Sequence, residues 1–178
     1  MPYNPEMHHR RSIRLLHYDY SRSGAYFITI CTHEKACLFG EIRDGKMVLN
    51  EYGRIVEYEL NRTMNIRPNV EIDVYSVMPN HFHGILVINS MVNSRRGVLQ
   101  YAPTNTALRS PSQTVGAIIR GFKSTITKCI NAIRNSPGVT VWQRNYYEHI
   151  IRDENEMHKI REYIVNNPLN WAEDENFK

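Results

Sequence analysis

The sequence predicts an α+β fold in which a ferredoxin-like (split βαβ) antiparallel sheet carries helices on one face and is followed by a C-terminal helix. Three observations predict it. Strand-like segments alternate with three amphipathic helical segments in the order β, small hairpin, α, β, β, α, β, α. The length of 178 residues suits one domain with a sizeable core. The composition is 42% hydrophobic and 22% charged, which is ordinary for a globular protein.

The first part of the predicted domain contains a strand, a small hairpin and a helix. Residues 25–32, AYFITICT, alternate with the period of a strand. FGEI and KMVL flank Arg43-Asp44-Gly45, so they are expected to pair as a hairpin with Asp-Gly in its turn. Asn50 is a suitable N-cap for a helix that runs to roughly Asn61.

A second hairpin is expected in the middle of the sheet. VEIDVYSV, residues 70–77, alternates cleanly, and Met78-Pro79-Asn80 supplies a turn. HFHGILVI, residues 81–88, then returns as a partner strand that ends in four aliphatic residues, which indicates burial on both faces.

The second half begins with a segment that has no periodicity. About residues 90–112 are rich in Ser, Asn, Pro and Thr and are expected to form a long mobile loop. A helix with an apolar stripe follows from Ser112. VTVWQRNYYEHII, residues 139–151, then supplies a final strand, and a last helix runs over 154–166 until Pro168 stops it. We therefore expect a basic tail over 1–20, one domain over 21–170, and a C-terminal tail over 171–178.

Charge and cysteine content limit the partners and the compartment. The net charge of +4 and pI near 9.0 favour a polyanionic partner without singling out nucleic acid. No apolar run approaches the ~20 residues that span a bilayer, and no signal peptide is recognisable, so no membrane partner is expected. Three cysteines without a C-x-x-C favour a reducing compartment, which predicts a cytoplasmic location.

Two histidines stand at the start of the aliphatic strand. Because alternate residues of a strand share a face, His81 and His83 are expected to point together, and Phe82 to the opposite side. Two neutral imidazoles so placed can reach one divalent ion. A bare H-x-H is more often two unrelated polar residues on an exposed face, and a metal site needs a third ligand from elsewhere.

The last helix supplies candidates for the missing groups. Tyr163 and Asn167 stand one turn apart at the edge of its apolar stripe. An amide oxygen is a reasonable ligand for Mg²⁺ or Mn²⁺ beside imidazoles. Alone, Tyr163 would be read as a packing residue, and Tyr146 and Tyr147 are rivals as nucleophile, although neither has an amide four residues later.

Three motifs, PNHFH, WQRNYYEH and YIVNNP, occur here in an order and spacing that resemble the single-tyrosine HUH transposases, in particular their REP-associated branch. The likeness runs from Tyr18 to Pro168. It implies that His81, His83 and Asn167 bind Mg²⁺ or Mn²⁺, although several family members have Gln at the last position. It also implies that Tyr163, on the C-terminal helix, attacks a phosphodiester of single-stranded DNA at hairpin-forming element ends. The products are a 5′-phosphotyrosine and a free 3′-OH, and strand transfer follows.

The resemblance also implies DNA contacts. Arg120 and Lys123 belong to a polar stripe of the long helix. From the sequence alone, a solvated surface and a row of phosphate contacts explain this stripe equally well. The resemblance favours the phosphate contacts. Composition makes the N-terminal segment a disordered tail, but in the resembled branch such segments help to read the foot of a DNA hairpin. Arg10, Arg11 and Arg14 are therefore DNA-binding candidates. The family further implies nucleoid association and leaves open a homodimer.

Two other functions compete with transposition. Ferredoxin-like sheets also serve as non-catalytic binding modules for single-stranded nucleic acid. A metal-dependent phosphodiesterase would use water as its nucleophile. Only the transposase predicts a covalent protein–DNA adduct.

Overall fold

The computed structural model describes residues 22–89 and 114–177 of the chain. The segment expected to be a mobile loop and the N-terminal candidates Arg10, Arg11 and Arg14 lie outside the described residues. Within the described ranges, every helix is too short or too polar to cross a lipid bilayer.

One four-stranded antiparallel sheet organises the fold, as predicted. Its strands are β1 (Gly24–Cys31), β4 (Val70–Val77), β5 (His81–Ile88) and β6 (Tyr147–Ile151), in the order β4-β5-β1-β6. The helix α1 (Glu51–Ile66) connects β1 to β4, and α2 (Val115–Ile133) connects β5 to β6. Each connection leaves room for one strand in between, which is the split βαβ arrangement.

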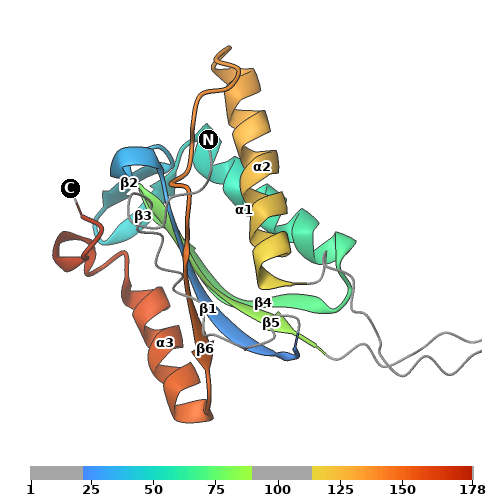
Figure 1. Ribbon diagram of the computed structural model, residues 1–178. Coiled ribbons are helices and arrows are strands. Elements are labelled where there is room, and N and C mark those ends of the chain that lie inside the picture. The colour runs from blue at the N-terminus through green and yellow to red at the C-terminus, as the bar shows by residue number, and fades with distance from the viewer. Residues whose placement is uncertain (1–21, 90–113, 178) are drawn as a thin grey trace, which may run out of the picture.

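The two faces of the sheet are covered by different helices. Helices α1 and α2 pack against each other on one face, and α3 (Glu154–Asn166) lies on the other (Figure 1). Strand alternation sorts the side chains between these faces, so Phe82 of β5 packs on Phe122 of α2, with ring centroids 5.6 Å apart. The histidines on either side of Phe82 therefore point toward α3.

The main core lies between the sheet and the α1–α2 pair. It is built from strand residues on that face and from the apolar sides of the two helices. Each fully buried aliphatic or aromatic side chain contributes roughly 1.5–3 kcal/mol. The core residues from the sheet include Tyr26, Ile28, Ile30, Phe82 and Leu86. This layer makes the sheet a rigid platform for groups on the α3 face.

The small hairpin and the start of the helix that follows it form as the sequence predicts. Strands β2 (Gly40–Arg43) and β3 (Lys46–Leu49) pair around Asp44 and Gly45, whose φ angles of 50° and 69° are those of a type I′ turn. The Asn50 side chain caps α1 by accepting a hydrogen bond from the Gly53 N–H at 3.0 Å. The helix ends at Ile66, five residues later than the expected Asn61.

Two segments differ from the expectation. The expected strand over 139–151 is shorter in the structure: residues 139–146 pair with the sheet only through one bridge between Trp142 and Thr32, and the Trp142 ring packs on Phe39 with centroids 5.1 Å apart. The C-terminal segment beyond residue 170 contains a short helix, η3 (Trp171–Glu173). It is tied to the rest of the chain by hydrogen bonds such as that from Asn80 Nδ2 to the Asn176 carbonyl oxygen.

Candidate metal and nucleophile site

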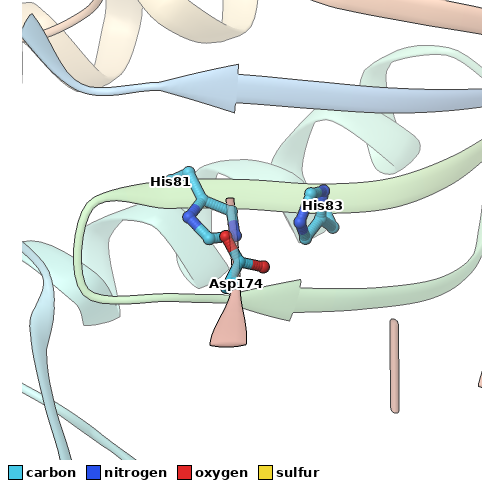
Figure 2. A group of neighbouring side chains, drawn as sticks. All are labelled: His81, His83 and Asp174. Carbon is cyan, nitrogen blue, oxygen red and sulfur yellow. The ribbon is translucent and has the colours of Figure 1, made fainter. Parts of the chain in front are cut away.

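Three ligand-type side chains meet on the α3 face of the sheet. His81 and His83 project from β5 with ring centroids 4.3 Å apart, and they are 0% and 1% exposed. Asp174, from the C-terminal segment, points at both rings (Figure 2). One ligand atom from each of the three residues lies within 4.8 Å of the others, which is close enough for one ion to bridge them.

Asn80 determines which nitrogen of His81 faces the cavity. The Asn80 Nδ2 group donates to the carbonyl oxygens of Lys35, at 3.1 Å, and Asn176, at 2.8 Å. Its Oδ1 is therefore the atom that lies 2.9 Å from His81 Nδ1, and it can only accept, so Nδ1 carries the proton. The lone pair on His81 Nε2 is left free to bind a cation.

His83 is oriented in the same way by the neighbouring strand. Its Nδ1 lies 2.8 Å from the hydroxyl oxygen of Thr29, the residue that faces it across the β1–β5 pair. Its Nε2 lies 3.2 Å from the hydroxyl oxygen of Tyr163. Both imidazoles therefore direct Nε2 toward α3.

Helix α3 is held across the sheet by contacts at two places. Near its start, Glu156 accepts a hydrogen bond from His149 of β6 at 2.7 Å. Farther along, the Arg161 guanidinium donates to both carboxylate oxygens of Asp73 in β4, at 2.7 and 2.9 Å. A bidentate pair of this kind restricts orientation, so α3 keeps Tyr163 directed toward the histidines.

Asn167 completes the group of possible ligands. It follows α3 directly, is 2% exposed, and donates from Nδ2 to Asp174 Oδ2 at 2.7 Å. Its Oδ1 and His81 Nε2 are buried and have no hydrogen-bond partner among the described residues. Unpaired buried polar atoms are costly, and a divalent cation would satisfy both. Imidazole nitrogens with amide and carboxylate oxygens suit Mg²⁺ or Mn²⁺.

Burial sets the charge state of the site. It lowers the pKa of His81 to about 4, and together with the neighbouring His81 it lowers the pKa of His83 to about 3. Both histidines are thus neutral at pH 7, as ligands must be. Burial opposes ionisation of Asp174, but hydrogen bonds from Asn167 and the Asn176 backbone outweigh it and lower the pKa of the carboxyl.

The same surroundings keep Tyr163 protonated when no cation is bound. Burial, followed by the negative charges of Asp174 and Glu175, raises the pKa of the Tyr163 hydroxyl to about 12. Tyr163 is 41% exposed and lines a cavity of about 660 Å³ together with Phe27 and Tyr147. The hydroxyl is thus accessible, but it needs a proton acceptor before it can act as a nucleophile.

Sequence relatives of this chain include two proteins of Haemophilus influenzae. The chain is 47% identical over 174 residues to an "Uncharacterized protein" of Haemophilus influenzae, covering 97% of this chain and 96% of the relative. It is 23% identical over 151 residues to a second protein of that species, provisionally named a REP-associated tyrosine transposase, covering 85% and 73% of the two chains. No protein-family profile matches the sequence.

The solved structure of a REP-associated tyrosine transposase bound to a REP hairpin shares the fold. It superposes with a TM-score of 0.59 at 17% identity and covers 90% of this chain and 75% of its own. In sequence and in fold, the chain is therefore similar to REP-associated tyrosine transposases.

Three residues that the sequence did not indicate contribute to the site. Thr29 and Asn80 orient the histidines, and Asp174 faces them. The position of Asn80 beside His81 is a weak local signal. Neither periodicity nor a motif distinguishes Asp174 in the sequence, because it lies between two other acidic residues, Glu173 and Glu175.

The two predicted DNA contacts on α2 are not brought to this site, because α2 lies on the opposite face of the sheet. Lys123 is half-buried, and its ammonium donates to the carbonyl oxygens of Gln143, Arg144 and Asn145 at 2.5–3.3 Å. Its hydrogen bonds are therefore used to hold the segment before β6. Arg120 is exposed and remains a candidate for phosphate contact.

Proposed function

We propose that this chain is a DNA transposase that cleaves single-stranded DNA at hairpin-forming ends through a 5′-phosphotyrosine on Tyr163 and then transfers the strand. The observation that carries the proposal is the position of the Tyr163 hydroxyl. It lies 3.2 Å from His83 Nε2 and 3.4 Å from Asp174 Oδ2, in the cavity where the possible metal ligands converge. The similarity of the chain to REP-associated tyrosine transposases supports the same reaction.

Some residues of the site would bind a metal ion, and Tyr163 would react with the DNA. His81, His83, Asp174 and Asn167 would hold Mg²⁺ or Mn²⁺, and such a cation supplies positive charge that polarises the scissile phosphate and favours the phenolate. Tyr163 Oη forms a bond to phosphorus while the bond to the 3′ oxygen breaks, and the 3′-OH leaves with a proton. Asp174 Oδ2, 3.4 Å from the Tyr163 hydroxyl, is the acceptor near the phenolic proton, because the Nε2 lone pair of His83 would be used to bind the cation.

Strand transfer is the reverse reaction with a different 3′-OH. Phenolate is a better leaving group than an alkoxide, because the pKa of tyrosine is about 10 in water. The phosphotyrosine bond therefore keeps the free energy of the cleaved phosphodiester. Because the histidines, Tyr163, Asn167 and Asp174 belong to one chain in this structure, we propose that one protomer is sufficient for cleavage, acting on DNA in the nucleoid.

Replacing Tyr163 with phenylalanine tests the proposal. The wild-type chain, incubated with Mn²⁺ and a DNA hairpin with single-stranded flanks, is expected to form an adduct that resists denaturation. Tyr163→Phe removes one partly exposed oxygen, so the fold and DNA binding should change little while the adduct and cleavage disappear. The matched controls Tyr146→Phe and Tyr147→Phe should retain both.

The outcomes separate the proposal from its alternatives. Cleavage by Tyr163→Phe at a rate near that of the wild type would identify water as nucleophile and the chain as a phosphodiesterase. DNA binding by the wild type without cleavage at any Mn²⁺ or Mg²⁺ concentration would identify a non-catalytic module.

A further inference from the structure

We propose that Phe27 and Tyr147 form a stacking site for a nucleobase directly beside the scissile phosphate. The inference rests on the proposed function, because Tyr163 defines where that phosphate lies. It adds a positioning role for two aromatic side chains on strands β1 and β6.

The two rings continue the site toward the edge of the sheet. Phe27 and Tyr147 lie on adjacent antiparallel strands and on the face that carries His83. The Phe27 ring stacks on His83 with centroids 5.4 Å apart, and it meets Tyr163 edge-on at 6.0 Å. It also meets the Tyr147 ring edge-on, with centroids 6.1 Å apart. These contacts make one aromatic wall from a possible metal ligand, past the nucleophile, to the outermost strand.

Exposure distinguishes this wall from ordinary core. The main core lies on the opposite face of the sheet, whereas Tyr147 is 51% exposed and lines the 660 Å³ cavity together with Phe27 and Tyr163. A single exposed aromatic residue is common and needs no explanation. Here the exposed ring joins two others that reach the nucleophile, and a flat ligand entering the cavity would meet their faces and edges.

Charge selects which part of a DNA strand fits. The C-terminal side of the cavity carries Glu173, Asp174 and Glu175, which repel any phosphate that is not neutralised by a cation. Among the described residues that line this cavity, those on the aromatic side carry no charge. A strand whose scissile phosphate lies at the possible metal ligands would therefore turn a neighbouring base, and not a second phosphate, toward Phe27 and Tyr147.

Stacking would help to position the reacting phosphate. Base–aromatic stacking tolerates any base, because every base has a π face. A base held on this wall would restrict rotation of the adjoining phosphodiester, so that phosphorus stays in line with the Tyr163 hydroxyl. Loss of the stack should weaken binding of single-stranded flanks and slow adduct formation.

A binding cycle tests the inference in the full-length Tyr163→Phe protein, which is expected to bind without cutting. The probe is a fluorescein-labelled DNA hairpin with single-stranded flanks, with Mn²⁺ present, and a series in which each flank nucleotide in turn is abasic. Tyr147→Ala should weaken binding of the intact DNA roughly 5- to 150-fold. Tyr147→Phe, which keeps the ring, should remain within about threefold. Tyr58→Ala is the matched control, because Tyr58 is a 67% exposed tyrosine on α1, beyond the opposite face of the sheet.

The stacking site is tested by whether the effect of Tyr147→Ala on affinity depends on the presence of one particular base in the DNA. At one flank position, removal of the base should abolish most of the effect of Tyr147→Ala, as expected when the two groups touch. Equal effects of Tyr147→Ala on the intact DNA and on every abasic DNA would overturn the stacking site, as would a loss of affinity no larger than that of Tyr58→Ala. Because this cycle measures binding without cleavage, it is separate from adduct formation by the wild type, which tests the proposed function.

Discussion

Replacement of Asn80 by alanine tests whether one buried amide both orients His81 and anchors the C-terminal segment that carries Asp174. The Asn80 side chain is 0% exposed and takes part in three hydrogen bonds, with His81 Nδ1 and with the carbonyls of Lys35 and Asn176. At about 1 kcal/mol for each buried hydrogen bond, the free energy of unfolding should fall by roughly 3 kcal/mol. For a chain of this size the Tm should fall by about 6–12 °C.

The same change should weaken metal binding, because His81 loses the partner that fixes its tautomer. Removal of such a partner typically lowers metal affinity by about 10- to 100-fold. Asn80→Asp is the matched control, since a carboxylate still accepts from His81 Nδ1 but has no N–H for the two carbonyls. It should lose stability as Asn80→Ala does, yet bind Mn²⁺ about tenfold or more tightly than that variant.

Calorimetric titration with Mn²⁺ and thermal unfolding of the three proteins measure both effects. Equal Mn²⁺ affinity in the wild type and in Asn80→Ala would refute the orienting role of Asn80. An unchanged Tm in both variants would refute its anchoring role.

Two further predictions concern pH and salt. Burial keeps His81 and His83 neutral with lowered pKa values. The unfolded chain therefore binds more protons below pH 6.5, and the metal-free protein should lose up to about 1.4 kcal/mol per pH unit per histidine between pH 6.5 and 4. Urea unfolding across this pH range measures the loss, and a free energy of unfolding that does not change with pH would contradict the prediction. Raising salt from ~50 to ~200 mM should weaken DNA binding tens-fold or more. Arg120→Ala should reduce the slope of log affinity against log salt by about 0.7–0.9, whereas Lys123→Ala should lower the Tm and leave that slope unchanged. The reverse pattern would return Lys123 to the DNA contacts.

The sequence by itself determined the helices and strands and those features of the site that depend on residues a few positions apart. Strand alternation alone places His81 and His83 on one face, and the Asp-Gly dipeptide and Asn50 predict a turn and a cap that the structure contains. Each of these depends on neighbours a few residues apart, for which backbone geometry is the same in any fold. The spacing between Tyr163 and Asn167 is local in the same sense.

Tertiary structure decided what surrounds those groups. Asp174 reaches the histidines only because the chain after α3 turns back over β5, and Asn80 and Lys35 bind the returning segment. Lys123 reads as an exposed cation along its helix, yet it is bound by carbonyls some twenty residues later. Contacts between distant segments depend on how whole layers pack, because a side chain's partners are set by three-dimensional distance and not by spacing along the chain.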